Sequence, residues 1–177
     1  MNIPNLLTLM RLFLIPVFYG LYQRGMYGSA LLVFLLASFT DFLDGYLARK
    51  WNQITNFGKL ADPIADKVMV LTALYCLAAD GRIPWFAPIA ILAKELLMVL
   101  GGAFMLGKKV VVQANIWGKA ATFAFIIALA LVFPWHGVEY LYKAGNILVI
   151  IATVMSIWAM VQYAYGCIKQ LKELKNA

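Results

Sequence analysis

Residues 41–67 read DFLDGYLARKWNQITNFGKLADPIADK and hold four aspartates, Asp41, Asp44, Asp62 and Asp66. The whole chain has eight acidic residues, so half of them fall in this window. Carboxylates are costly near hydrocarbon unless they are paired, hydrated or bound to a metal. The stretch therefore indicates a site that needs concentrated negative charge, and a divalent cation is the simplest candidate for its ligand.

The composition around this stretch is that of a membrane protein. The 177 residues are 64% hydrophobic and 13% charged, whereas soluble domains are about 45–50% apolar and about 25% charged. A spanning helix needs roughly 20 apolar residues. The chain is therefore predicted to be all-α and integral to the membrane, with six transmembrane helices in a single domain over residues 1–177. The expected spans are about 3–22, 29–49, 57–79, 84–106, 116–134 and 144–168.

The positive charge indicates a membrane orientation. The net charge is +7, and lysines beside apolar spans are typical of membrane topology and of contact with anionic lipid, not of nucleic-acid binding. Six spans place both termini on one side, together with most of the basic residues. The positive-inside rule then predicts that the termini and residues 41–67 face the cytoplasm. The single histidine, His136, excludes a histidine-rich metal site.

Polar residues inside two other spans are further candidates. Asn5, Thr8 and Arg11 recur at intervals of three in the first span and so lie on one helix face. They either line a polar cavity or form an interfacial face with a snorkelling arginine. Lys94 and Glu95 lie at the middle of the fourth span, where a charged pair is a functional hypothesis by default.

Helical spacing brings the aspartates together in pairs. At about 100° per residue, Asp41 and Asp44 are roughly 60° apart and Asp62 and Asp66 roughly 40° apart. The connection between the two helices is short, which predicts antiparallel neighbours whose four carboxylates can face one groove. Hard divalent cations with oxygen ligands remove the repulsion between such carboxylates, and Mg²⁺ keeps coordination sites open for a substrate phosphate.

The full pattern is more specific than its parts. It reads D-x-x-D-G-x-x-A-R, then eight residues, then G-x-x-x-D-x-x-x-D. The fixed positions are Asp41, Asp44, Gly45, Ala48, Arg49, Gly58, Asp62 and Asp66. This pattern matches the signature of the CDP-alcohol phosphatidyltransferase family without a mismatch, and the resemblance extends to length and six-helix layout.

The resemblance implies an activity and a set of roles. Enzymes of this family move a phosphatidyl group from CDP-diacylglycerol to an alcohol and release CMP. By the resemblance, Asp41, Asp44 and Asp62 bind Mg²⁺ or Mn²⁺, with two ions expected. Asp66 acts as the general base and can share the metal site. The residues that hold the CDP part are Gly45, Ala48, Arg49 and Gly58. A homodimer is usual in the family.

The acceptor is inferred from similarity within the family. The runs ARKWNQITNFGKLADPIADK and NIPNLLTLMRLFLIPVF resemble bacterial members whose acceptor is sn-glycerol 3-phosphate. This implies a multi-pass enzyme of a bacterial plasma membrane. The candidate acceptor-binding residues are Lys94, Glu95, Lys119 and Thr122. Two positions depart from that group, because Lys94 stands where arginine is typical and Ala121 where a second lysine is typical.

Three alternatives remain open on the sequence. A cardiolipin synthase of the same family uses phosphatidylglycerol as acceptor. An intramembrane prenyltransferase also combines aspartate pairs with Mg²⁺ on a pyrophosphate. A small, non-enzymatic cation transporter would explain the aspartates, but not the fixed offsets of Gly45, Ala48, Arg49 and Gly58.

Overall fold

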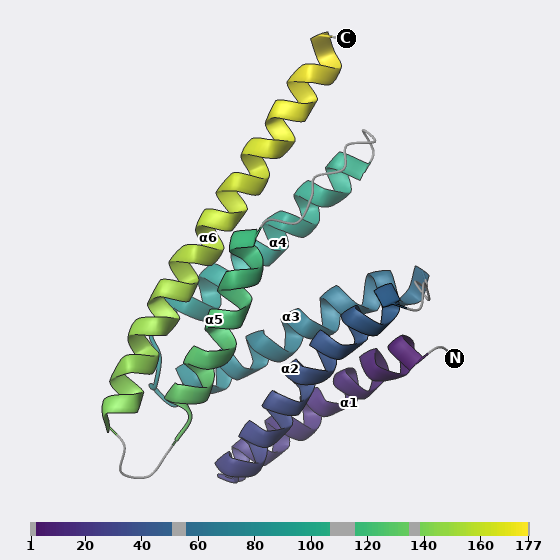
Figure 1. The fold of residues 1–177 in the computed structure, drawn as a ribbon. Coiled ribbons are helices and arrows are strands. Elements are labelled where there is room, and N and C mark those ends of the chain that lie inside the picture. Colours follow the sequence, from purple (N-terminus) through teal and green to yellow (C-terminus); the bar gives the residue numbers. More distant parts are fainter. Residues whose placement is uncertain (1–2, 51–55, 107–115, 135–138, 177) are drawn as a thin grey trace. The chain divides into compact units, whose positions relative to one another are not determined.

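A computed structural model describes residues 3–50, 56–106, 116–134 and 139–176, with side chains described within 9–40, 67–102, 116–134 and 139–170. These residues form six α-helices (Figure 1). The helices are α1 (Ile3–Gln23), α2 (Tyr27–Lys50), α3 (Asn56–Ala79), α4 (Phe86–Leu106), α5 (Ile116–Val132) and α6 (Glu139–Asn176). The prediction of an all-α protein is therefore confirmed for the described residues.

The helices belong to two compact units. Unit 1 comprises Met1–Arg82 and Val132–Val138 and contains α1, α2 and α3. Unit 2 comprises Ile83–Leu131 and Glu139–Ala177 and contains α4, α6 and all of α5 except its last residue. A single catalytic domain over residues 1–177 stays a prediction.

Unit 1 is a three-helix arrangement in which α1 contacts both α2 and α3, and α2 contacts α3. The helices α1 and α3 begin at the end of the unit where α2 finishes (Figure 1). Consecutive short connections give this up-down-up order. As a result, the first turns of α1, the last turns of α2 and the first turns of α3 share one end of unit 1.

Aromatic side chains fill the core of unit 1. Phe18 and Phe34 are fully buried, and their ring centroids are 6.1 Å apart. Phe133 packs edge-on against Phe18 at 6.2 Å and against Tyr22 at 5.8 Å. Aromatic pairs of this kind contribute about 0.5–1.5 kcal/mol each beyond their area burial. They hold α1 against α2 and against the segment that follows α5.

Glycines end α1 and α3 in the same way. Gly25 and Gly81 have φ values of 72° and 67°, which side chains with a Cβ rarely adopt. At each end the residue after the glycine donates a backbone hydrogen bond to the carbonyl five positions earlier: Met26 to Leu21 at 3.0 Å and Arg82 to Leu77 at 2.8 Å. This is a Schellman closure. Both glycines lie between the spans predicted from the sequence, Gly25 between 3–22 and 29–49 and Gly81 between 57–79 and 84–106.

In unit 2, α4 contacts α6, and α6 is longer than the sequence predicts. A turn over residues 136–143 was expected, but α6 already begins at Glu139. An acidic residue in the first turn complements the helix dipole, and Glu139 also forms an ion pair with Lys143, one turn later, at 2.8 Å. These two local interactions explain the earlier start.

The length and apolar character of the helices can be compared with the predicted membrane spans. Within the described ranges, the segment Glu139–Gln170 of α6 is long and apolar enough to cross a bilayer. Shorter apolar helical segments are Leu9–Gln23, Tyr27–Thr40, Lys67–Ala79 and Ile116–Val132. The arrangement as six transmembrane spans stays a prediction.

Candidate active site

The aspartate motif is divided between two neighbouring helices of unit 1. Asp41 and Asp44 belong to the C-terminal half of α2, and Asp62 and Asp66 belong to the N-terminal half of α3. These halves lie at the same end of unit 1 (Figure 1). The side chains of residues 41–66 lie outside the described residues. The directions in which the four carboxylates and Arg49 point therefore stay a prediction. The binding of the CDP part by Gly45, Ala48 and Gly58 also stays a prediction.

The chemistry of the motif fits a hard metal ion. The described acidic side chains are those of Asp80, Glu95 and Glu139, and each has a polar partner elsewhere, namely Tyr22, Lys94 and Lys143. No group of three metal-ligating side chains occurs among the described side chains, which do not include those of the motif. Carboxylate oxygens are the ligands that Mg²⁺ and Mn²⁺ prefer, and a metal site at the motif stays a prediction.

Arg11 of α1 lies in the half of its helix that begins at the motif end of unit 1. Its residue exposure is 1%, so it is among the most deeply buried side chains described. A guanidinium buried in protein favours an interior role over the snorkelling alternative. Asn5 and Thr8 lie in the same helix, but their side chains are outside the described part, and the predicted polar cavity stays a prediction.

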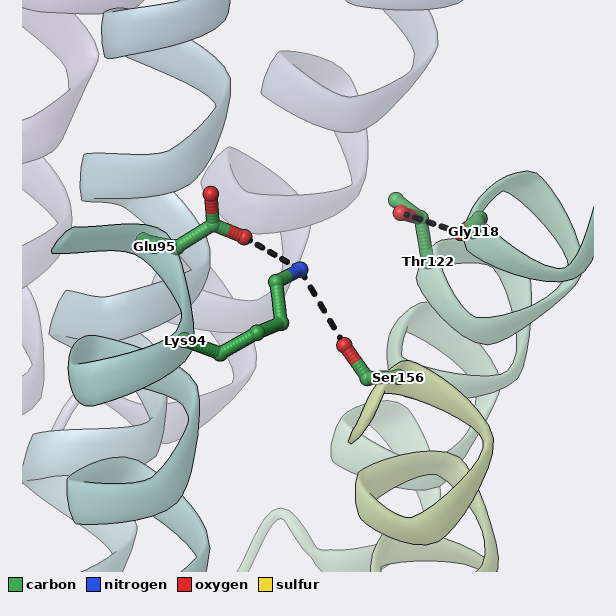
Figure 2. Close-up of polar contacts among 5 residues, drawn as sticks. All are labelled: Lys94, Glu95, Gly118, Thr122 and Ser156. Atoms are coloured by element: carbon green, nitrogen blue, oxygen red, sulfur yellow. Dashed lines mark hydrogen bonds and ion pairs between the residues drawn. The ribbon is translucent and has the colours of Figure 1, made fainter. Parts of the chain in front are cut away.

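A polar cluster joins α4 to α6 in unit 2. The ammonium of Lys94 is 2.5 Å from Oε1 of Glu95 and donates a hydrogen bond of 3.2 Å to Oγ of Ser156 (Figure 2). The side chains of Lys94 and Glu95 are 14% and 13% exposed, and Ser156 is buried. Ser156 was missed by the sequence analysis, because a lone serine in an apolar run follows no recognisable motif.

The remaining candidates for the acceptor site are on α5. The hydroxyl of Thr122 donates to the carbonyl of Gly118, one turn earlier, at 3.2 Å (Figure 2). Lys119 is exposed. Neither residue is bonded to Lys94, whose partners are Glu95 and Ser156. The structure thus joins Lys94 and Glu95 but does not join Lys119 or Thr122 to them.

Comparison with known proteins decides the family. Residues 1–158 match the sequence model of CDP-alcohol phosphatidyltransferases. The chain belongs to the CDP-alcohol phosphatidyltransferase family. This is a family of membrane enzymes, and the long apolar α6 agrees with it. The family resemblance drawn from the aspartate motif is confirmed, and the prenyltransferase and transporter alternatives no longer hold.

Similar proteins in three bacteria carry the same name, CDP-diacylglycerol–glycerol-3-phosphate 3-phosphatidyltransferase. The protein of Haemophilus influenzae is 38% identical over 169 residues, covering 92% of this chain and 91% of the relative. That of Escherichia coli is 38% identical over 169 residues and covers 92% of both chains. That of Salmonella choleraesuis is 39% identical over 170 residues and covers 92% of both. The protein is accordingly a phosphatidyltransferase.

Proposed function

We propose that the protein transfers the phosphatidyl group of CDP-diacylglycerol to sn-glycerol 3-phosphate, releasing CMP and forming phosphatidylglycerophosphate. The observation that carries this proposal is the shared name of the relatives, which are 38–39% identical over 92% of the chain. The reaction is a step of phospholipid biosynthesis.

The aspartates of α2 and α3 act at the donor substrate, CDP-diacylglycerol. Asp41, Asp44 and Asp62, with Asp66 sharing, would hold two Mg²⁺ or Mn²⁺ ions. Such ions would supply positive charge to neutralise the charge that develops on the pyrophosphate as the bond to CMP breaks. Gly45, Ala48 and Gly58 let the CDP part approach the helix backbone closely, and Arg49 contacts its phosphates.

The transfer itself is a substitution at phosphorus. A hydroxyl oxygen of the acceptor attacks the phosphorus of the phosphatidyl group, and the bond from that phosphorus to the oxygen of CMP breaks. CMP leaves with the electron pair of this bond. The carboxylate of Asp66 accepts the proton of the attacking hydroxyl, for which it must come within hydrogen-bond distance of that oxygen.

The acceptor carries its own phosphate, which requires cations. Lys94 and Lys119 supply these positive charges, and Glu95 forms an ion pair with Lys94. Thr122 is the fourth residue of the proposed acceptor site. The position of Lys94 supports this assignment, because its side chain is only 14% exposed within an apolar helix, where an ionisable residue is a functional hypothesis by default. Lysine is a point charge and not the fork that arginine presents, so a single phosphate oxygen is its natural ligand.

The proposed architecture is that of an enzyme that spans a membrane. Six transmembrane helices form a single catalytic domain over residues 1–177, in the plasma membrane of a bacterium. Both termini and the aspartates face the cytoplasm, where CDP-diacylglycerol presents its head group while its acyl chains stay in the bilayer. The protein works as a homodimer.

One other acceptor has a specific observation in its favour. Lys94 and Ala121 stand where arginine and a second lysine are typical of the glycerol 3-phosphate group. Fewer cations suit a lipid acceptor, so the alternative is a cardiolipin synthase that uses phosphatidylglycerol.

The test is CMP release by the purified protein in detergent with CDP-diacylglycerol and Mg²⁺. Glycerol 3-phosphate and phosphatidylglycerol are supplied in parallel reactions. We expect CMP release with glycerol 3-phosphate alone. Release with phosphatidylglycerol alone would replace the proposal by the cardiolipin synthase.

A further inference from the structure

The hydroxyl of Ser156 is bonded differently from the described threonine hydroxyls of unit 2. In that unit, Thr122 and Thr153 each donate to the carbonyl four residues earlier, at 3.2 Å and 2.8 Å. This is the usual way for a serine or threonine to satisfy its O–H inside an apolar helix. Ser156 makes no such bond among the described residues. Its oxygen instead accepts from Lys94 of α4.

The contact fixes the direction of a charged group. A lysine ammonium has three donors and a flexible four-carbon stem, so burial alone does not orient it. Glu95 and Ser156 take two of the three donors, from two different helices. Lys94 has no further partner among the described residues, so one N–H stays available for a ligand.

The N–H of Lys94 that stays available is a charged donor. A phosphate offers only acceptor oxygens when it is ionised, and it forms short, strong bonds with charged donors. Glu95 provides the charge that makes a buried ammonium tolerable before the ligand arrives. The site therefore suits an anion whose oxygen atoms accept hydrogen bonds. Ser156 is the residue of this site that no sequence pattern reveals.

We propose that Ser156 is a positioning residue of the acceptor site, which holds the Lys94 ammonium between α4 and α6 so that it binds the phosphate of glycerol 3-phosphate. This inference rests on the proposed function. Ser156 acts through Lys94 and takes no part in the transfer at the CDP-diacylglycerol phosphorus. Its loss should therefore weaken acceptor binding and leave donor binding unchanged.

The experiment measures KM for each substrate and kcat in Ser156→Ala, Ser156→Thr and Ser156→Cys. The expected result for Ser156→Ala is a rise of about tenfold in KM for glycerol 3-phosphate, the size of one lost hydrogen bond to a charged group. KM for CDP-diacylglycerol should stay within about twofold, as should kcat. Ser156→Thr keeps the hydroxyl and should restore a low KM for glycerol 3-phosphate.

Thr153→Val is the matched control. Thr153 is a buried hydroxyl residue one turn earlier on α6, but its O–H is bonded only within its own helix. We expect both KM values of Thr153→Val to match those of the unchanged protein. If Ser156→Ala does not fold, Ser156→Cys replaces it, because a thiol of similar size is only a weak acceptor.

Three outcomes overturn the inference. Unchanged constants in Ser156→Ala, or an equal rise in both KM values, would show that Ser156 only packs α6 against α4. A rise that Ser156→Thr does not reverse would show that the hydroxyl is not the cause. Failure of the proposed function looks different, because the unchanged protein then releases no CMP with glycerol 3-phosphate.

Discussion

Tyr22 at the end of α1 donates a hydrogen bond of 2.7 Å to Oδ2 of Asp80, in the turn that follows α3. The two residues are 58 positions apart in the chain. The bond ties together the ends of α1 and α3 that lie opposite the aspartate motif, and Tyr22 is buried. The contact therefore contributes to the stability of unit 1 and is remote from the proposed chemistry.

Tyr22→Phe should destabilise the protein without slowing the reaction. The change removes a partly buried hydrogen bond to a carboxylate, which costs about 1.5–3 kcal/mol. Thermal unfolding in detergent measures the loss. Tyr19→Phe is the control, because Tyr19 is on the same helix and is 42% exposed. Equal melting temperatures for the two variants would contradict the role assigned to the bond.

Asp62→Asn should abolish CMP release and leave a folded protein. The substitution removes one of the negative charges proposed to hold the metal ions. The measurement pairs CMP release with thermal unfolding. Asp80→Asn, at the other end of α3, should keep its activity although it loses stability. Substantial activity in Asp62→Asn would end the metal-ligand role of that residue.

Lys119→Ala should raise KM for glycerol 3-phosphate by about tenfold, since it removes a charge from a phosphate site. KM for CDP-diacylglycerol should change little. Lys143→Ala is the matched control, because Lys143 is an exposed lysine of the same unit that pairs with Glu139. An equal effect of Lys119→Ala on both substrates would argue against acceptor binding by Lys119.

Glu95→Gln and Glu139→Gln make the same chemical change in two different settings. The side chains of the Lys94–Glu95 pair are 14% and 13% exposed, and those of the Lys143–Glu139 pair are 70% and 80% exposed. Breaking the covered pair should lower the free energy of unfolding by about 3 kcal/mol, because an ammonium loses its countercharge away from water. Breaking the exposed pair should cost less than about 1 kcal/mol. Chemical denaturation of both variants tests the contrast, and equal losses would contradict it.

Gly81→Ala and Gly20→Ala should change stability in opposite directions. An added Cβ meets no atom within 4 Å at either position, so the difference lies in the backbone. Gly81 has a φ of 67°, where alanine is strained by about 1 kcal/mol. Gly20 lies within α1, where alanine is favoured by about 0.8–1.0 kcal/mol. Thermal unfolding of the pair distinguishes the two signs.

The helices were largely predictable, because apolar runs and turn glycines are local signals. The predicted third helix, about 57–79, differs from α3 by one residue at its start, and Gly25 and Gly81 lie between the predicted spans. The start of α6 was not predicted correctly, because the ion pair between Glu139 and Lys143 stabilises a helical turn before the apolar run begins. Hydropathy alone does not detect such a pair.

The candidate site was predictable where it follows a spaced motif and unpredictable where it depends on packing. Asp41, Asp44, Asp62 and Asp66 are recognised by spacing alone; they lie within the residues that match the family, and their roles stay a prediction. Ser156 could not be found, because it is 62 positions from Lys94 and only the contact between α4 and α6 brings them together. A charge inside an apolar helix indicates that a partner exists but not where it is.

The continuity of α6 has a mechanical consequence. Its 38 residues form one helix through Asn176, which at 1.5 Å per residue is about 57 Å long. A bilayer core is about 30 Å thick. In the proposed topology, the basic C-terminal end of the chain therefore extends from the membrane surface as a stiff rod. A tilt of α6 within the bilayer would then displace that end by a larger distance than the part inside the bilayer. A flexible tail would not transmit the tilt in this way.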